Sequence, residues 1–404
     1  MPSRAVQTIL AAVAWGAVVL GGAQAATPPA QPRTGPGSAG DTTTEVVKRA
    51  IGRTGAATYV YHLAAAPAEP RSVVVLLHAW GAVNPVVYGG WIDQLARRGN
   101  LVLYPGFQTV GRTRPVEATD LAATLIRDAL AALADDPQAR PDSSRLFYIG
   151  HSAGAAIGLN LAATAQDRGL ASPRLVFAVM PGGIASDEKS RGIQLADLSR
   201  IDPATLITTI VGDREFQAAD RASRRILRET TNVPASRKLF MRSFSDDHGF
   251  PALTATLASA GSAKDGYDSS TIKLAPEPPI DPKAPRTARP RWSADSVLTG
   301  EQTVLLGQLQ RNVTDTLDYL AYWRSFDILA AAAVGGGDLT LLRSDPSFLD
   351  MGRWTDSWPV RRLIAETPKS GETVASAPPT RAVGPAPIQS KQPVVRRRET
   401  RQAR

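Results

Sequence analysis

The stretch Phe147-Tyr148-Ile149-Gly150-His151-Ser152-Ala153-Gly154, which reads FYIGHSAG, places a serine among small residues where an apolar run meets an alanine-rich segment. The run Leu146–Ile149 is typical of a buried strand, and Ala153–Arg168 has the spacing of a helix. The pentapeptide Gly150–Gly154 matches G-x-S-x-G. A sharp strand-to-helix turn strains the backbone of the serine, and side chains on either flank would collide, so glycine is required there.

The predicted turn also gives the serine a particular electrostatic setting. Ser152 would lie at the N-terminus of a helix, where backbone N–H groups without partners favour developing negative charge. A small-residue turn that holds a serine by chance is the alternative. The strand before the motif and the helix after it favour a nucleophile.

Alternating strand and helix patterns surround this turn. Further apolar, β-branched runs lie at Thr58–Leu63, Val73–His78, Leu101–Tyr104, Leu175–Met180, Leu206–Val211 and Lys238–Met241. Helical patterns lie at Val86–Arg97, Val116–Ala134 and Phe216–Thr231. This alternation predicts an α/β fold with a doubly wound, mostly parallel sheet flanked by helices. Ligands of such sheets bind at the carboxyl ends of the strands, so functional residues are expected directly after strands.

Composition excludes several classes of site. The chain has 404 residues, of which 43% are hydrophobic and 21% charged, as in a globular protein with a packed core. It contains no cysteine, which excludes a disulfide framework, a cysteine-based zinc site and a thiol nucleophile. The formal net charge is +9, so the location of the basic residues matters.

Basic residues concentrate in the C-terminal segment 366–404, which has eight basic and three acidic residues and is rich in Pro, Ala, Ser and Thr. Such a segment buries too little apolar surface to offset the entropy of ordering, so a disordered tail is predicted. Weak contact with an anionic cell envelope is one interpretation, and a solvated tail without a partner is the other. No specific nucleic-acid partner is expected, and the oligomeric state is not predicted.

The N-terminus predicts an export signal over residues 1–25. Arg4 supplies a positive flank, Ile9–Leu20 is almost wholly apolar, and Ala23-Gln24-Ala25 is a small-x-small cleavage site. An uncleaved membrane anchor is the alternative. Cleavage would leave a secreted or periplasmic protein that begins with a Pro/Gly-rich linker over residues 26–45.

A single globular domain is expected over residues 46–365, with a Pro-rich insertion around 261–300. This insertion and Gly182–Pro203 are candidates for mobile loops over the site, with inert insertions as the alternative. Glu301–Ala333 has the apolar spacing of one long amphipathic helix. The aromatic-rich segment Phe348–Ile364 is expected to dock on the domain.

A serine hydroxyl is a poor nucleophile without a base, which is normally histidine. The chain has four histidines. His62 lies inside a predicted strand and His151 inside the turn, where packing roles are expected, while His78 ends a strand and opens the sequence HAWG. His248, in FSDDHGFP just after the last apolar run, is the candidate base.

The base in turn needs a carboxylate that fixes its tautomer. Asp213 follows a predicted strand in LITTIVGDRE and is the first choice. Glu215 and Asp246 remain alternatives. Asp247 is adjacent to His248 and is poorly placed to reach its ring.

From Val73 to the last long helix, the chain resembles the α/β-hydrolase superfamily, in its secreted serine esterase and lipase-like branch. In that family the nucleophile, the acid and the histidine follow strands five, seven and eight of an eight-stranded-type sheet. If Val73–His78 is strand three, Ser152, Asp213 and His248 take these places in the same order.

The resemblance also implies an oxyanion hole. It would combine the backbone N–H of Ala153 with one from the loop His78-Ala79-Trp80-Gly81, where Trp80 is the first choice. Ala79 replaces the glycine of the usual family motif, so Ala79 is the alternative donor, and a tight turn with a buried tryptophan is the structural alternative. No metal or organic cofactor is expected for this chemistry, and singly spread histidines argue against a zinc site.

The activity implied by the resemblance is hydrolysis of carboxylic esters through an acyl-enzyme on Ser152. The substrate would be a small or polymeric ester, as for lipases, cutinases and related polyester hydrolases. A serine peptidase or acyltransferase of the same fold is the second hypothesis. A non-catalytic, envelope-binding protein that uses the basic tail is the third.

Overall fold

The structure is a computed structural model that describes residues 25–215, 217–274, 292, 294–298 and 300–366. Nearly all of the predicted signal peptide, residues 275–291 of the Pro-rich insertion, and the tail beyond Glu366 lie outside this part. Every described residue belongs to one compact unit. Within these ranges, no helix is both long enough and apolar enough to cross a membrane.

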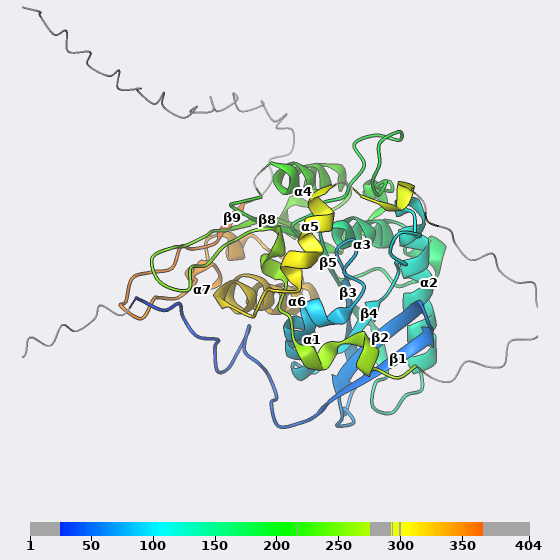
Figure 1. Ribbon diagram of the computed structural model, residues 1–404, viewed down its shortest axis with the longest axis horizontal. Helices are drawn as coiled ribbons and strands as arrows, with labels where there is room; N and C mark the ends of the chain where they lie inside the picture. The colour runs from blue at the N-terminus through cyan, green and yellow to red at the C-terminus, as the bar shows by residue number, and fades with distance from the viewer. Residues whose placement is uncertain (1–24, 216, 275–291, 293, 299, 367–404) are drawn as a thin grey trace, which may run out of the picture. The chain divides into compact units, whose positions relative to one another are not determined.

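One mixed sheet organises the described residues, with strands in the order β1-β2-β4-β3-β5-β6-β7-β8-β9 (Figure 1). The strands from β3 to β8 are parallel, whereas β1, β2 and β9 pair antiparallel with their neighbours. Their bounds are β1 Val46–Arg53, β2 Ala56–Leu63, β3 Arg71–Leu77, β4 Leu101–Pro105, β5 Pro141–His151, β6 Leu175–Val179, β7 Leu206–Gly212, β8 Lys238–Ser243 and β9 Ile364–Glu366. The predicted α/β, mostly parallel sheet is confirmed.

All the apolar runs identified in the sequence are strands, and the sequence missed only edge strands among the described ones. The central strands β4, β6 and β7 are buried at every residue, as parallel strands covered on both faces should be. The edge strand β1 carries charged residues and is exposed at several positions, so it lacks the apolar run that marks the others. The edge strand β9 has only three residues.

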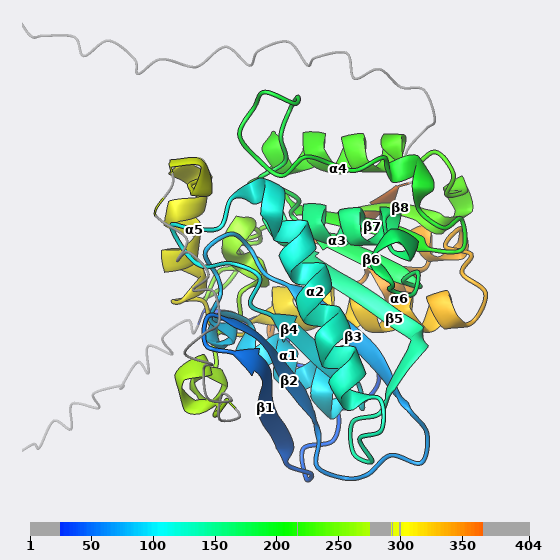
Figure 2. The ribbon, with the colours of Figure 1, turned by 90° about the vertical axis from the view of Figure 1, so that its right-hand side faces the viewer.

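Helices cover both faces of the sheet (Figures 1 and 2). On one face, Trp91 of α1 and Phe326 of α6 pack against Phe177 of β6. The other face carries α2, α3 and α4. The bounds are α1 Gly89–Arg97, α2 Pro115–Leu133, α3 Ala153–Ala163, α4 Ala218–Glu229, α5 Gly300–Leu309, α6 Arg324–Val334 and α7 Pro346–Leu349. This layering leaves the carboxyl edge of the parallel strands for the loops.

The expectation of one long helix over Glu301–Ala333 is wrong. The chain leaves the helical path after α5 and re-enters it in the π-helix Leu317–Trp323, which continues into α6. The Asp315 carboxylate accepts a hydrogen bond from the Leu317 N–H at 2.7 Å, and the Asn312 side chain donates to the Ala258 carbonyl at 2.7 Å. The local bond to Asp315 caps the helix that follows, and the bond from Asn312 ties the break between the helices to the segment that contains Ala258.

The segment 26–45, expected to be a linker, packs along the domain. The Ala26 carbonyl accepts from the Phe250 N–H at 2.8 Å, and the Pro29 carbonyl accepts from the Thr316 hydroxyl at 2.9 Å. Further along, the Gly37 N–H donates to the Asp327 carboxylate of α6 at 2.8 Å. The prolines and glycines of residues 26–45 prevent helix and strand formation, but the segment is still bound to the domain by hydrogen bonds.

Removal of the Asp327 carboxylate tests this attachment. Asp327→Ala leaves the Gly37 N–H without its acceptor and removes the carboxylate that lies 3.5 Å from the Arg98 guanidinium. We expect faster cleavage within residues 26–44 in limited proteolysis and a loss of about 2 kcal/mol of stability. Asp128→Ala on the exposed side of α2 is the matched control. Equal cleavage rates in the two variants would contradict the assignment.

Candidate functional site

The backbone at Ser152 adopts the conformation predicted for a nucleophile turn. Ser152 lies between the end of β5 and the start of α3, with φ 51° and ψ −114°. Positive φ values are uncommon outside glycine and mark backbone strain, which concentrates at functional sites. The Ser152 N–H donates to the Val179 carbonyl of β6 at 3.0 Å, which holds the turn on the sheet.

Glycines make this turn possible because neighbouring backbone approaches them closely. A Cβ at Gly154 would lie 2.0 Å from the Leu77 carbonyl oxygen of β3, and a Cβ at Gly150 would lie 2.5 Å from the Ala155 Cα. On the opposite side, a Cβ at Gly182 would lie 3.1 Å from Ser152 Oγ. The last contact also identifies Gly182, which follows β6, as a residue beside the serine oxygen.

The Ser152 hydroxyl is buried and has no hydrogen-bond partner among the described residues. The residue is 1% exposed. A buried hydroxyl without a partner carries a desolvation cost, and such groups call for an explanation, of which a reactive role is one. A substrate would reach this oxygen only if the residues that bury Ser152 moved.

Hydrogen bonding of the backbone N–H groups distinguishes Trp80 from Ala79, the two candidates for the second oxyanion donor. The Ala79 N–H donates to the Tyr88 hydroxyl at 3.2 Å, and the Gly81 N–H donates to Gln108 Oε1 at 2.7 Å. Within the described part of the chain, no acceptor pairs with the N–H of Trp80 or of Ala153. Trp80 is thus the residue of its loop whose N–H stays available, which favours it over Ala79.

The structure does not bring His248 to Ser152. The His248 Nε2 atom lies 2.6 Å from Asp356 Oδ2, and its ring stacks on Trp358 with centroids 5.3 Å apart. Its backbone N–H donates to Asp246 at 3.1 Å. His248 follows β8 as the strand count predicted, but its ring belongs to a cluster with the segment that contains Asp356.

The structure does not bring Asp213 to His248 either. Asp213 Oδ1 accepts from the Ser245 N–H at 3.0 Å and from the Ser245 hydroxyl at 2.7 Å, while Asp213 Oδ2 lies 3.6 Å from Arg361. These contacts stabilise the turn after β8. The predicted triad is therefore not assembled in this arrangement, and the catalytic roles of Asp213 and His248 stay predictions.

His151 lies in a line of hydrogen bonds across the carboxyl edge of the sheet. The Tyr88 hydroxyl donates to His151 Nδ1 at 2.7 Å, and His151 Nε2 donates to the Leu257 carbonyl at 2.8 Å. Burial lowers the pKa of His151 to about 4, so the ring is neutral at neutral pH. With both ring nitrogens engaged, His151 has no free lone pair for Ser152.

The other two histidines are also buried elsewhere. His78 donates from Nδ1 to the Ala79 carbonyl at 2.8 Å and stacks on Phe107 at a centroid distance of 4.0 Å. Burial lowers the pKa of His78 to about 4. His62 contacts the Leu63 carbonyl at 2.8 Å, and burial lowers its pKa. All four histidines of the chain are thus described, and none contacts Ser152 Oγ.

Glu215, which the sequence left as an alternative acid, reaches the segment beside His151. Its Oε1 atom accepts from the Leu257 N–H at 3.0 Å. The same Leu257 residue accepts from His151 through its carbonyl. Only the tertiary structure reveals this connection, since nothing in the sequence marks Leu257.

The last described residues of the Pro-rich insertion and helix α5 cover the Trp80 loop. The Trp80 indole N–H donates to the Ser296 carbonyl at 2.9 Å, and a Cβ at Gly81 would lie 3.9 Å from a Leu306 methyl of α5. Figure 1 shows α5 in front of the sheet, and Figure 2 shows it beside one sheet edge. The other candidate cover, Gly182–Pro203, contributes Gly182 beside the serine.

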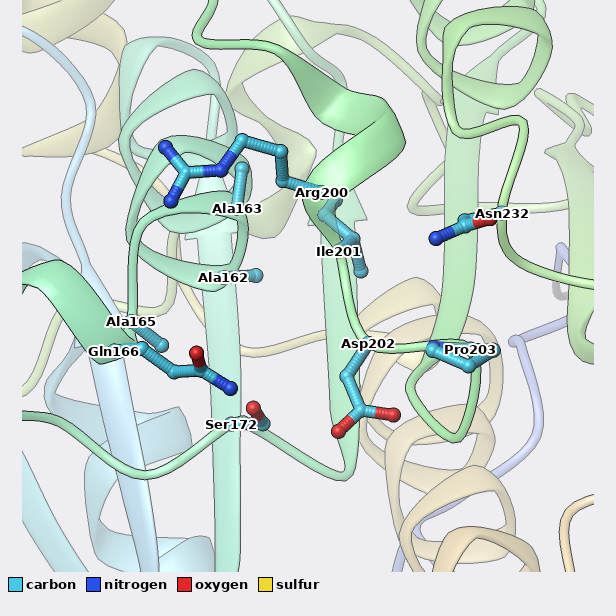
Figure 3. A pocket seen from close by; sticks show the side chains of 10 residues that line it. All are labelled: Ala162, Ala163, Ala165, Gln166, Ser172, Arg200, Ile201, Asp202, Pro203 and Asn232. Atoms are coloured by element: carbon cyan, nitrogen blue, oxygen red, sulfur yellow. The ribbon is translucent and has the colours of Figure 1, made fainter.

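A separate pocket of about 260 Å³ lies around the C-terminal end of α3, away from the turn at its N-terminus (Figure 3). Its lining residues are Ala162, Ala163, Ala165, Gln166, Ser172, Arg200, Ile201, Asp202, Pro203 and Asn232. None of the predicted site residues lines it. In the described ranges, no group of three or more His, Asp or Glu side chains is placed to hold a metal ion.

Substitutions in α3 test the requirement for glycine in the turn. Gly154→Ala places a methyl group against the Leu77 carbonyl, so we expect a loss of about 3 kcal/mol or more in the free energy of unfolding. At Gly158, in the same helix, the nearest atom to a new Cβ is a Leu77 methyl at 3.2 Å. Gly158→Ala should therefore change stability by less than about 1 kcal/mol. Similar melting temperatures for both variants would refute the close packing.

Acid should destabilise the fold through the buried histidines. Both His78 and His151 have a folded-state pKa of about 4, below the value of 6.5 for an unperturbed histidine. The unfolded state therefore binds more protons between those values, and the free energy of unfolding falls as pH falls through that window. The loss is roughly 2 kcal/mol per histidine from pH 7 to pH 5. Urea unfolding should show a loss smaller by about that amount in His78→Asn, and an unchanged loss would contradict the prediction.

Comparisons with known proteins found only distant structural similarities. No family model and no curated protein matches the chain. Among solved structures, the chain is similar to one of two fungal esterases from Rhizomucor miehei, with 12% identity, 50% of this chain and 75% of that chain covered, and a TM-score of 0.38. It is also similar to carboxyl esterase 2 of the mycorrhizal fungus Tuber melanosporum, with 15% identity, 51% and 79% coverage, and a TM-score of 0.36. Likenesses this distant carry no argument about activity. The strand order and the serine turn give the chain the α/β-hydrolase fold that the sequence predicted.

Proposed function

We propose that the chain acts on carboxylic esters through Ser152, which accepts the acyl group, and that it does so outside the cytoplasm. The observation that carries the proposal is the strained backbone of Ser152 together with its buried, unpartnered hydroxyl. Packing alone requires neither the strain nor the unpaired hydroxyl, because alanine would remove the hydroxyl and glycine would relieve the strain. The export signal predicted over residues 1–25 supports the location.

The reaction balances without a cofactor. Ser152 Oγ forms a bond to the ester carbonyl carbon, the tetrahedral intermediate collapses, and the alcohol leaves with a proton as its C–O bond breaks. Water then hydrolyses the acyl-enzyme and restores the serine. The N–H groups of Trp80 and Ala153 would hold the oxyanion, where one donor typically contributes about 10²–10³ in rate.

Each step needs a proton acceptor, which takes the proton of the serine hydroxyl in acylation and a proton of the attacking water in deacylation. The sequence assigns this role to His248, which would have to leave Asp356 and Trp358 to perform it. This observation favours a second candidate function, in which the site binds an ester and becomes acylated but turns over slowly. The two candidates differ in the rate of hydrolysis and share the acylated serine.

Access to the site requires movement of its cover. Ser152 is 1% exposed. The Trp80 loop is covered by Ser296 and by Leu306 of α5. We propose that the ester displaces this cover. Contact of the basic tail with an anionic envelope remains a separate proposal and is testable by deletion of residues 366–404.

A fluorophosphonate probe tests the reactive serine directly. After prolonged incubation with the full-length mature chain, intact-mass and peptide analysis should place the phosphonyl adduct on Ser152. Ser152→Ala should remove the adduct, while Ser270→Ala, at an exposed serine, should leave it unchanged. A wild-type chain that stays unmodified, or an adduct that persists in Ser152→Ala, would refute the proposed function.

A further inference from the structure

We propose that Glu215 and residue 257, and not Asp213 and His248, occupy the acid and base positions of the Ser152 site, and that leucine at position 257 leaves the base position without a proton acceptor. This inference rests on the proposed function in one respect, that Ser152 is the reacting group. It decides between the two candidate functions in favour of slow turnover.

The first argument is the placement of residue 257. Its N–H donates to Glu215 Oε1 at 3.0 Å, and its carbonyl accepts from His151 Nε2 at 2.8 Å. His151 directly precedes Ser152 in the turn. Residue 257 therefore lies one hydrogen bond from a carboxylate and one hydrogen bond from the neighbour of the nucleophile. A triad histidine needs a position between its acid and its nucleophile, and the two backbone contacts place residue 257 between Glu215 and the turn that carries Ser152.

The second argument is that the segment is firmly held at the carboxyl edge of the sheet. The Ala255 carbonyl accepts from the Arg214 N–H at 3.2 Å, and the Ala255 N–H donates to the Ser245 hydroxyl at 3.0 Å. A Cβ at Gly212, the last residue of β7, would lie 2.2 Å from that same carbonyl oxygen. Leu253 and Asp246 exchange two backbone hydrogen bonds of 2.8 and 2.9 Å. The position of residue 257 thus follows from contacts with the ends of β7 and β8.

The third argument is that the predicted pair is committed elsewhere. Both hydrogen bonds to Asp213 Oδ1 come from Ser245, and the acceptor that pairs with His248 is Asp356. Glu215 differs from Asp213 because its carboxylate reaches the segment that contacts His151. The order nucleophile, acid, base along the chain is preserved, since residues 152, 215 and 257 follow β5, β7 and β8.

A missing base has a known scale of effect. Loss of the histidine from a serine-protease triad lowers kcat by about 10⁶, while the oxyanion hole and substrate binding still accelerate the reaction by about 10³–10⁴ over water. The native chain would then react with activated acyl or phosphonyl reagents and hydrolyse esters slowly. The unpartnered Ser152 hydroxyl agrees with this, because a base at hydrogen-bond distance would be its partner.

Leu257→His is the decisive substitution. We expect kcat/KM for p-nitrophenyl acetate to rise by about 10² or more, because general-base catalysis contributes about 10²–10⁴. The gain should depend on pH as titration of an imidazole requires, and it should disappear when Ser152→Ala or Glu215→Gln is added. Leu257→Gln, which is polar but supplies no base, is the matched control and should show no gain.

Chemical rescue covers the case in which the histidine variant does not fold. Leu257→Ala opens space at the same position, so added imidazole should accelerate ester hydrolysis by this variant more than by the wild type. A folded Leu257→His chain without a gain, together with no rescue of Leu257→Ala, would overturn the inference.

The outcomes also separate this inference from the proposed function. If His248→Gln abolished the ester hydrolysis of the wild-type chain, His248 would be the base. That result would overturn the inference but would not contradict the proposed function, ester hydrolysis through Ser152. Conversely, a wild-type Ser152 that resists the probe would refute the proposed native activity, while a gain of reactivity in Leu257→His would still support residue 257 as the base position.

Discussion

The close approach of helix α3 to strand β3 is the constraint on which the site depends. Gly154 lies so near the Leu77 carbonyl that no other residue fits, and this contact fixes where the helix starts. The chain must therefore turn within one residue between β5 and α3, and that residue, Ser152, takes a positive φ. Strain in the turn is offset by packing of the fully buried helix α3 against the sheet.

The same carboxyl edge gathers the other groups of the site. Loops after β3, β5, β6, β7 and β8 meet there because parallel strands end at one edge. A line of hydrogen bonds from Ala79 through Tyr88 and His151 to Leu257 and Glu215 ties these loops together. Each group in this line forms a hydrogen bond with its neighbour. The hydroxyl of Ser152 is not part of the line and has no hydrogen-bond partner among the residues that the structure describes. Under the proposed function, this site has Ser152 as its nucleophile and the N–H groups of Trp80 and Ala153 as its oxyanion donors, and it lacks a base in place.

Two segments outside the central sheet cover parts of the domain surface, and one of them lies over the candidate site. Residues 294–298 near the end of the Pro-rich insertion and helix α5 contact the Trp80 loop through Ser296 and Leu306, respectively. The N-terminal strap, residues 26–45, attaches to α6 and to the loop before the π-helix on the α1 and α6 side of the sheet. These segments thus complete the surface of the domain, and specific polar contacts hold residues 26–45 in place.

The sequence by itself determined the α/β architecture, the strands of the central sheet and the serine turn, because apolar periodicity and a glycine-flanked serine are local signals. It also placed Asp213 and His248 correctly after β7 and β8. Which side chains meet was decided only by the tertiary structure. The ring of His248 contacts Asp356 and Trp358, which lie more than a hundred residues away in the chain. Ser245 donates a hydrogen bond to the carboxylate of Asp213. Backbone hydrogen bonds place residue 257 at the carboxyl edge of the sheet. Almost any amino acid can form them, so no pattern of residue types could have revealed this placement.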